Sequence, residues 1–391
     1  MTHVTTDPST PRRVDLADLA QRSVALIERL QHPQGAYPAS PTFSAYRGYS
    51  WFRDGAFIAD AMSAAGAAES ASRFFDWCDR MLAEHSDEVA EIVAAEAAGT
   101  PLPDDRMLPT RFTLDGSAGD DDWWDFQTDG YGTWVWAAVS HARRHGLNLE
   151  RWAPGIRLSV DYLLATAHRP CYDWWEEHRD EVHVSTLGCI VAGLEAAADA
   201  HVLPAATAAR ARTTAAECRA LIIERGTHEG HLAKWLGASA VDASLAAVIA
   251  PLGVIDATST LGLVSIRAID DALTVDGGVH RYLDDTFFGG GQWPLLSCML
   301  GLAYAAAGDT ERAQAQLEWA ARTETAEGFL PEQVGDHLLA PEREREWIDR
   351  WGPVATPLLW SHAMVVRLAV ELGVAGAADT SATATGPEEP S

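Results

Sequence analysis

Adjacent carboxylates beside tryptophans give the chain one clear means of acid–base chemistry, in a segment that reads HRPCYDWWEEHRD. Glu176 and Glu177 directly follow Trp174 and Trp175. An apolar aromatic wall raises the pKa of a carboxyl group because it disfavours the charged form, and a neighbouring carboxylate raises it further. Glu176 could therefore stay protonated near neutral pH and act as a general acid. A structural alternative makes Asp173 a helix N-cap and Glu176 part of a capping box.

A second carboxylate with apolar neighbours is Glu332, in the segment TAEGFLPEQVG. It follows Pro331 and lies beside Phe329 and Leu330, so a turn could hold it as a general base. An ordinary exposed turn glutamate fits the same pattern. Further on, in TPLLWSHA, His362 stands near the start of a predicted helix, where a single histidine is more often structural than catalytic.

Polar groups that could hold a sugar occur in the segment YRGYSWFRDG. Arg53 and Asp54 could form a fork that hydrogen-bonds sugar hydroxyls, with Trp51 as an apolar wall. The structural alternative is that Asp54 only stabilises the N-terminus of the helix that begins near Ala56, because a negative charge there interacts favourably with the helix dipole.

Two further segments, GGVHRYLDDTFFGGGQW and DDWWDFQTDG, combine polar and aromatic residues. In the first, an arginine can pair with aspartates, and the glycines 289–291 either allow the backbone close to a ligand or form a flexible turn. The aspartates 120–122 have no recognised calcium-loop spacing, so we expect no metal site there. The candidates in these segments are Arg281, Asp284, Asp285, Trp123, Trp124, Gln127 and Asp129.

Several other chemistries find no support in the sequence. It contains no glycine-rich phosphate loop with lysine, no HExxH and no GxSxG, and its 14 histidines do not cluster at metal-ligand spacing. We therefore expect neither a metal nor a cofactor. The formal net charge of −27 repels phosphate backbones and excludes nucleic acid as a partner. Carboxylates and aromatic residues remain, which is the equipment of glycoside hydrolysis.

Helices must position these residues, since apolar residues recur at helical spacing along most of the chain. About twelve helices in consecutive pairs suggest an all-α fold, the (α/α)6 barrel or toroid, although an irregular bundle or a solenoid fits the same periodicity. A break at Gly308, Asp309 and Thr310 predicts a helix stop followed by a helix start. The predicted helices lie near residues 16–30, 54–66, 68–84, 87–98, 129–145, 149–167, 181–201, 204–225, 240–250, 257–273, 292–308, 309–323 and 355–373.

Long loops between these helices carry the candidate residues. Loops of this length inside a compact domain are usually functional, so we expect them to meet at one mouth of the barrel. They span residues 35–53, 101–128, 168–180, 274–293 and 325–356.

One domain is the simplest organisation, because no linker rich in proline, serine or glycine interrupts the chain. We expect a loose arm over 1–13, a catalytic domain over 14–374 and a disordered low-complexity tail over 375–391. The sequence has no secretory signal and no apolar run of 18 residues, and its five widely spaced cysteines form no disulfide framework. These features predict a monomer in the cytoplasm that does not bind membranes.

Five blocks in order resemble glycoside hydrolase family 15, the glucoamylase family: WFRDGAF, QTDG, YDWWEE, RYLDDTFFGGGQW and LPEQ with PLLWSHA. The blocks span residues 46–363, most of the chain. The resemblance implies an (α/α)6 barrel. It also implies that Glu176 is the general acid, that Glu332 is the general base and that Glu177 binds the sugar at the adjoining subsite.

The reaction implied by the resemblance is a single displacement that releases β-glucose from a non-reducing end. Glu176 would protonate the glycosidic oxygen while Glu332 activates a water on the opposite face, with the two carboxyl groups about 6.5–9.5 Å apart. Arg53, Asp54 and Arg281 would hold the hydroxyls of the terminal glucose. The other substrate-binding residues would be Trp51, Trp123, Trp124, Asp129, Trp175, Phe287, Phe288 and Trp360.

Departures from the family pattern predict the substrate. Where starch-active members have two tyrosines, this chain has Phe287 and Phe288, and it shows neither a β-sandwich domain before the barrel nor a starch-binding module after it. With a cytoplasmic location, these differences favour small α-glucosides, above all isomaltose and short isomalto-oligosaccharides with α-1,6 bonds. Maltose and trehalose are the alternatives. The pattern does not place the tyrosine that usually lies near the water, for which Tyr46 and Tyr49 are candidates.

Other functional classes can use the same features. A sugar epimerase or isomerase on the same toroid would need a pair of histidines, for which His183 and His362 are the candidates. A non-catalytic module would bind glucosides and release nothing. A glucosyl transferase or a phosphorylase is a further alternative, and the phosphorylase would need phosphate for turnover.

Overall fold

The structure is a computed structural model that describes residues 14–117, 119, 123 and 126–376 of the 391-residue chain. The predicted arm over 1–13 and nearly all of the predicted tail over 375–391 lie outside the described residues. Trp124 and the aspartates 120–122 lie outside them as well.

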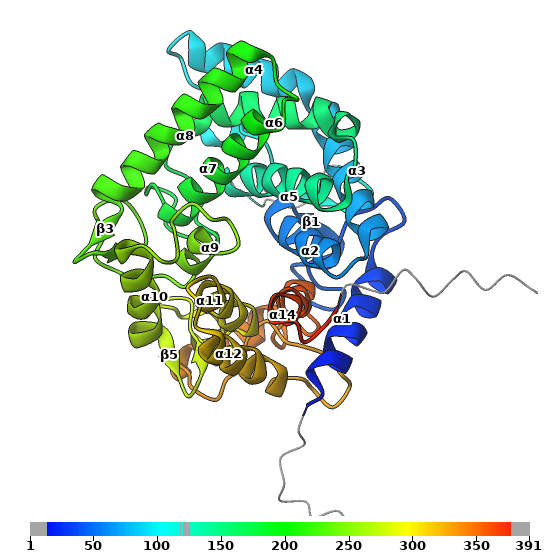
Figure 1. The fold of residues 1–391 in the computed structure, drawn as a ribbon, viewed down its shortest axis with the longest axis vertical. Helices are drawn as coiled ribbons and strands as arrows, with labels where there is room; N and C mark the ends of the chain where they lie inside the picture. Colours follow the sequence, from blue (N-terminus) through cyan, green and yellow to red (C-terminus); the bar gives the residue numbers. More distant parts are fainter. Residues whose placement is uncertain (1–13, 118, 120–122, 124–125, 377–391) are drawn as a thin grey trace, which may run out of the picture.

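An inner ring of six helices surrounds the centre of the described part of the chain (Figure 1). Each helix packs against the next, and the last packs against the first, which closes the ring. These helices are apolar on nearly all sides, as expected for helices enclosed by others. The inner helices are α2 (Phe52–Ala64), α5 (Asp129–His145), α7 (Val184–Asp199), α9 (Leu245–Ile249), α11 (Pro294–Ala306) and α14 (Leu359–Glu371).

An outer ring of six helices covers the inner one in the same described residues, and inner and outer helices alternate along the chain (Figure 1). Most outer helices, among them α1, α3, α10 and α12, have amphipathic sequences, as expected for helices that bury one face. The two rings confirm the predicted (α/α)6 barrel. The outer helices are α1 (Leu16–Leu30), α3 (Ala68–Glu84), α6 (Ala153–Thr166), α8 (Ala205–Arg225), α10 (Thr260–Leu273) and α12 (Thr310–Arg322).

Local signals set where several helices begin and end. The predicted break between α11 and α12 is confirmed, because Gly308 has a φ of +85° and the side chain of Asp309 accepts a hydrogen bond from the Arg312 N–H. Close packing of α5 on α7 depends on glycine, since a Cβ atom on Gly132 would lie 2.2 Å from the Cys189 carbonyl oxygen.

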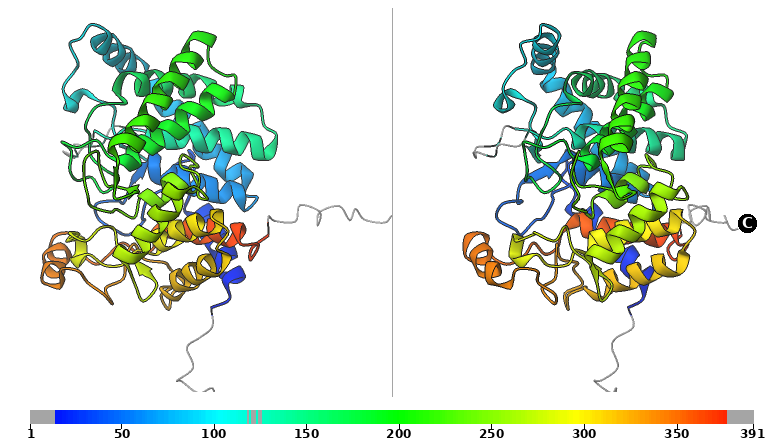
Figure 2. Two further views of the ribbon diagram at one scale, coloured as in Figure 1. Left: turned by 60° about the vertical axis from the view of Figure 1, so that its left-hand side comes forward. Right: turned by 90° about the vertical axis from the view of Figure 1, so that its left-hand side faces the viewer.

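Two further α-helices lie outside the rings, α4 (Ser86–Ala97) and α13 (Glu344–Trp351). The first was predicted. The prediction that all of 325–356 is loop is wrong for α13, because its eight residues are too few for a periodicity window of 11–18 residues to detect. In side view α13, in orange, projects at one end of the barrel (Figure 2). The short 3-10 helices are η1 (Asp104–Arg106), η2 (Leu149–Trp152), η3 (Phe287–Gly289) and η4 (Pro341–Arg343).

Short antiparallel strand pairs brace the loops. The pair that matters most for the site joins β1 (Tyr49–Trp51) to β2 (Arg111–Thr113), with Trp51 opposite Arg111. It ties two predicted long loops together directly before α2. The other pairs are β3 (Thr227–His228) with β4 (His231–Leu232) and β5 (Thr274–Val275) with β6 (Gly278–Val279).

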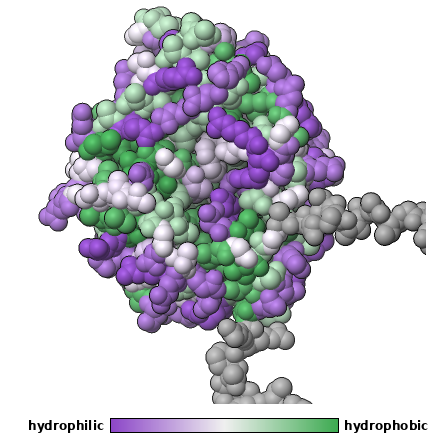
Figure 3. All heavy atoms as spheres, in the orientation of Figure 1, coloured by the Kyte–Doolittle hydropathy of each residue, from purple (hydrophilic) through white to green (hydrophobic). Residues whose placement is uncertain are grey.

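Hydrophilic and apolar residues are mixed on the surface. Hydrophilic side chains cover most of the outer helices on the face seen in Figure 3, with apolar side chains between them. Among the described residues, no helix combines the length and the apolar character needed to span a bilayer.

Candidate active site

A cavity of about 380 Å³ contains both predicted catalytic glutamates, Glu176 and Glu332. Loops that connect the inner and outer helices supply most of its lining, as predicted. Nine of the predicted binding residues line it too: Trp51, Arg53, Asp54, Trp123, Trp175, Glu177, Arg281, Phe287 and Trp360.

The predicted general acid lies in a tight turn that we call the acid loop (residues 172–178). One carboxylate oxygen of Asp173 accepts hydrogen bonds from the backbone N–H groups of Trp175 (3.0 Å) and Glu177 (2.9 Å). Glu176 has a φ of +64°, a left-handed conformation that is strained for a residue with a side chain. The capping-box alternative is therefore wrong, because no helix follows Asp173 and its carboxylate stabilises a turn instead.

The side chain of Glu176 is oriented by Trp51, whose indole Nε1 donates a hydrogen bond to Oε1 at 2.6 Å. Burial raises the pKa of Glu176 above its ordinary value, while the positive charge of Arg53 and the hydrogen bond from Trp51 act in the opposite direction. A raised pKa suits a group that must carry a proton to a leaving oxygen.

The predicted general base, Glu332, lies in a second loop that we call the base loop (residues 330–334). Tyr46 donates a hydrogen bond from its hydroxyl to Glu332 Oε1 at 2.9 Å. The other oxygen, Oε2, is buried and has no hydrogen-bond partner within the described part of the chain. Burial raises the pKa of Glu332 to about 8, opposed by the Tyr46 hydrogen bond and by Arg281. Tyr46 and Arg281 therefore favour the ionised form that a base needs.

Helix α14 holds the base loop in place. The Leu330 N–H donates to His362 Nε2 at 2.9 Å, so the ring proton lies on Nδ1, which is 2.9 Å from Ser23 Oγ. The hydroxyl of Ser361 donates to the Pro331 carbonyl oxygen at 2.8 Å. Burial lowers the pKa of His362 to about 3. His362 is therefore structural, which was the alternative considered for it.

The histidine pair that an epimerase would need is not at the cavity. His183 is buried, and its Nε2 donates to the His178 carbonyl oxygen at 3.0 Å. Within the described residues, the cavity lining includes no histidine.

The predicted Arg53–Asp54 fork faces the cavity from the first turn of α2. Arg53 Nε lies 3.6 Å from Asp54 Oδ2, and its Nη1 contacts Asp129 Oδ1 at 3.1 Å and the side-chain oxygen of Gln127 at 2.5 Å. Burial raises the pKa of Asp54 to about 7, although Arg53 opposes this. Asp129 is fully buried behind Arg53 and holds the arginine in place. The geometry therefore does not support the prediction that Asp129 binds substrate directly.

A second arginine is held on the other predicted segment. Arg281 makes two hydrogen bonds to Asp285, one of them from Nε to Oδ2 at 2.7 Å, and lies 3.6 Å from Glu177 Oε1. The predicted partner Asp284 is exposed and takes no part. The glycine run serves the turn rather than a ligand, because a Cβ atom on Gly290 would lie 2.3 Å from the Asp285 carbonyl oxygen.

Aromatic side chains form the remaining walls. Phe287 lines the cavity, but Phe288 is buried behind it with a φ of +49°, so its predicted direct contact with substrate is wrong. A turn that reverses direction between two neighbours sends their rings to different sides. The sequence analysis did not select several lining residues, among them Trp174, Trp293, Trp347, Arg350 and Trp351. The spacing of Trp347 and Trp351, four residues apart, was the available signal.

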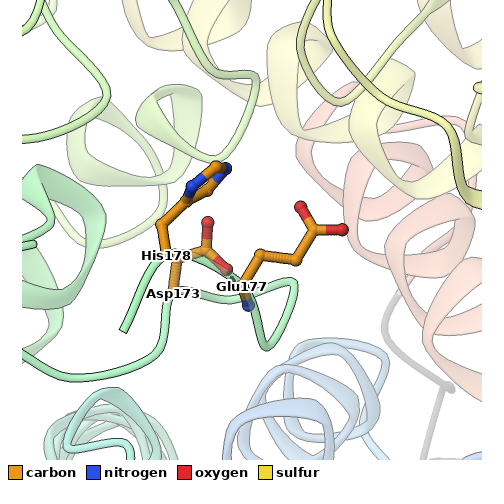
Figure 4. Close-up of side chains that lie close together, drawn as sticks. All are labelled: Asp173, Glu177 and His178. Carbon is orange, nitrogen blue, oxygen red and sulfur yellow. Dashed lines mark hydrogen bonds between the residues drawn. The ribbon is translucent and has the colours of Figure 1, made fainter. Parts of the chain in front are cut away.

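Three side chains of the acid loop, Asp173, Glu177 and His178, lie close enough together to hold a metal ion (Figure 4). Two of them have other partners: Asp173 lies 3.5 Å from the ammonium of Lys234, and Glu177 accepts a hydrogen bond from Tyr282. These contacts assign the cluster to the organisation of the acid loop. We assign no metal to it.

Residues 15–337 match the family model of Glycosyl hydrolases family 15. The chain belongs to this family and is a glycoside hydrolase.

Two relatives are similar over nearly their whole length. The isomaltose glucohydrolase of Kribbella flavida is 53% identical over 360 residues, which cover 92% of this chain and 94% of that protein. A glycosidase solved as the wild type is 51% identical with a TM-score of 0.90, covering 95% of this chain and all of that one, and a variant of it was solved in complex with glucose. A bacterial glucoamylase complexed with acarbose, 20% identical with a TM-score of 0.72 over 91% of this chain and 56% of that one, shares the fold.

Proposed function

We propose that the protein is an exo-acting, inverting α-glucosidase that releases β-glucose from isomaltose and short isomalto-oligosaccharides. The observation that carries the proposal is the pair of glutamates in one cavity, each with an oxygen fixed by an aromatic donor. A cavity of about 380 Å³ is near the small end of ligand sites, which suits a substrate of few sugar rings.

In this mechanism Glu176 donates its proton to the glycosidic oxygen as the bond breaks. Glu332, in its ionised form, removes a proton from a water that attacks the anomeric carbon from the opposite face, and the hydrogen bond from Tyr46 favours that ionised form and orients it. Positive charge that develops on the sugar ring is stabilised by the surrounding carboxylates. One displacement inverts the configuration, so an α-glucoside yields β-glucose.

The remaining polar groups of the cavity fit the terminal glucose. Arg53 and Arg281 are buried and held by carboxylates, Asp54 lies beside Arg53, and all three line the cavity, where hydroxyl groups can pair with them. Trp51, Trp175 and Trp360 supply apolar faces for the ring. Glu177, beside Arg281, fits the adjoining subsite.

The choice of an α-1,6 substrate is supported by the 53% identity to an isomaltose glucohydrolase and by Phe287 and Phe288 in place of two tyrosines. Time-resolved proton NMR with isomaltose, maltose and trehalose tests it. We expect isomaltose to be cleaved fastest and β-glucose to appear before mutarotation. Fastest cleavage of maltose or trehalose overturns the substrate, and early α-glucose overturns the mechanism.

The roles of the two glutamates have a separate test. Glu176→Gln and Glu332→Gln should each lower kcat by at least about a thousandfold while thermal unfolding stays cooperative. Rates near those of the parent enzyme in either variant contradict that assignment.

We also propose that residues 14–374 act as one catalytic unit, as a monomer in the cytoplasm. Its five cysteines are buried free thiols, as a reducing compartment would keep them. Light scattering should give the mass of one chain, 42.2 kDa, and fractionation should recover the activity with cytoplasmic markers. A dimer mass contradicts the proposed monomer, and activity outside the cytoplasm contradicts the proposed location.

A further inference from the structure

Of the 29 lysines and arginines in the chain, Lys234 is the only lysine. It follows β4 and is fixed by its backbone, which accepts a hydrogen bond from the Val184 N–H at the start of α7 (3.1 Å) and donates one to Ala240 (2.8 Å). Its side chain is 2% exposed. It is not among the residues that line the described cavity.

Three groups behind the cavity lining surround its ammonium. Nζ lies 3.0 Å from Asp242 Oδ2, 3.5 Å from Asp173 Oδ2 and 3.2 Å from the centroid of the Tyr282 ring. Both carboxylates are buried, and the ring contact is a cation–π interaction.

Each of these three groups connects Lys234 to the acid loop. Asp173 accepts the two backbone hydrogen bonds that shape the turn on either side of Glu176. Asp242 Oδ2 accepts a hydrogen bond from the Trp175 indole at 2.9 Å. Tyr282 donates its hydroxyl proton to Glu177. One charge is therefore coupled to the residues before and after the predicted acid.

The charge is needed because two buried carboxylates otherwise face each other across the same space. Burial opposes ionisation of Asp242, but Lys234, together with hydrogen bonds from Ser244 and Trp175, outweighs it and lowers the pKa of Asp242. Without a cation both carboxylates keep hydrogen bonds but lose their positively charged partner, and a buried charge without a counter-charge is costly enough to rearrange the groups around it. The strained φ of Glu176 makes the turn sensitive to such a change.

We propose that Lys234 is a positioning residue, which holds the acid loop so that Glu176 reaches the glycosidic oxygen. The proposal rests on the proposed function, because it assigns Lys234 a role through the general acid. A lysine suits the position better than an arginine, since a compact ammonium can approach the Tyr282 ring and two carboxylates together.

The test compares two substrates in Lys234→Met. Isomaltose needs protonation of a sugar leaving group, whereas α-glucosyl fluoride releases fluoride with little help from an acid. We expect kcat for isomaltose to fall by about 10- to 100-fold, by analogy with residues that orient the ligands of catalytic metals. We expect kcat for α-glucosyl fluoride to fall at least about fivefold less. Equal losses on both substrates, or no loss on isomaltose, overturn the proposal.

Arg367→Met is the matched control, because Arg367 is also largely buried and its Nε lies 3.0 Å from Asp60, away from the acid loop. It should leave the ratio of the two kcat values at that of the parent, even where the melting temperature falls. A changed ratio in this variant counts against the proposal, because the loss of any buried ion pair would then be enough to change the ratio of the two kcat values.

A second variant covers the case in which Lys234→Met does not fold. Lys234→Met combined with Asp242→Asn removes both members of the 3.0 Å pair, so fewer unpaired charges remain buried. The ratio should still change, since the contacts to Asp173 and Tyr282 are lost. A parent-like ratio overturns the proposal. A parent enzyme that cleaves neither substrate instead overturns the proposed function, which separates the two failures.

Discussion

Tyr46 and Trp51 lie edge to face with their ring centroids 5.5 Å apart, and each donates a hydrogen bond to a different one of the two cavity glutamates. Tyr46 contacts Glu332, and Trp51 contacts Glu176. The two carboxyl groups come from loops more than 150 residues apart in sequence, yet one aromatic pair beside β1 orients both. A shift of either ring therefore changes the geometry of both glutamates.

We expect Tyr46→Phe to move the acidic limb of the kcat/KM profile to higher pH. The hydroxyl of Tyr46 stabilises ionised Glu332, so its removal raises the pKa of Glu332 further above its ordinary value. A hydrogen bond to a charged group contributes about 1.5–3 kcal/mol, which corresponds to a shift of about one to two pH units. The profile of Tyr49→Phe is the control, because the Tyr49 ring stacks on Arg111 instead. An unshifted limb in Tyr46→Phe contradicts this role.

Because Glu332 is buried, we expect the free energy of unfolding to fall as the pH rises. The folded state holds the Glu332 proton up to about pH 8, whereas the unfolded chain releases it near the ordinary value of 4.5. The stabilisation is complete below pH 4.5, declines by about 1.4 kcal/mol for each pH unit between pH 4.5 and pH 8, and is lost above pH 8.

Glu332→Gln removes this titration. The difference in melting temperature between variant and parent should therefore grow in favour of the variant between pH 4.5 and pH 8. Thermal unfolding in buffers across this range measures it. A difference that stays constant with pH shows that the proton on Glu332 is not linked to folding.

We expect Asp129→Asn to weaken catalysis although Asp129 does not reach the cavity. Its carboxylate holds Arg53 Nη1 at 3.1 Å, so the neutral amide leaves the guanidinium less well oriented toward the sugar. Steady-state kinetics should show kcat/KM lowered about 10- to 100-fold, as for other residues that orient a binding group. Unchanged kinetics in a folded variant would mean that Gln127 and Asp54 suffice to hold Arg53.

We expect the second sugar of the substrate to bind against helix α13. Trp347 lines the cavity and is fixed by a hydrogen bond from its Nε1 to the Thr286 carbonyl oxygen at 2.8 Å. Trp347→Ala should raise KM for isomaltose about three- to tenfold, as expected for the loss of an aromatic contact, and leave hydrolysis of α-glucosyl fluoride nearly unchanged. Ile348→Ala, on the same helix but outside the cavity lining, is the control. Equal effects on both substrates place Trp347 at the terminal glucose instead.

Much of the fold could be read from periodicity, because long helices repeat a strong apolar pattern. The break at Gly308 and Asp309 combines a residue that tolerates positive φ with a residue that caps a helix, so its position was predictable. Helix α13 was missed because it is short, charged and has no fully buried residue. Its stability comes from contacts with η4, which lies directly upstream, and with η3, which lies about 55 residues upstream. The local sequence cannot indicate the contact with η3.

The residues of the candidate site, too, could be predicted from the sequence only in part. Residues in compact motifs, such as Arg53 with Asp54 and Glu176 with Glu177, were identified because one segment carries them. Lys234 was missed because its meaning depends on Asp173 and Asp242, which only the folded chain brings to it. Phe288 was assigned to the cavity wrongly, since periodicity cannot show which of two neighbours in a left-handed turn faces inward.

The packing of α14 against α2 has a consequence for how the barrel can be built. The inner ring closes through contacts between its last helix, α14, and its first helix, α2, not through the covalent chain (Figure 1). Circular permutation is tolerated where chain ends lie near each other and the new ends fall in an exposed loop. A permuted gene that joins residues 14 and 376 by a flexible linker and opens the chain in the turn between α11 and α12, where Gly308 is exposed, should keep the interhelical packing and both glutamates in place. The position of the chain ends is therefore set by the gene, whereas the site depends on the closed ring of helices.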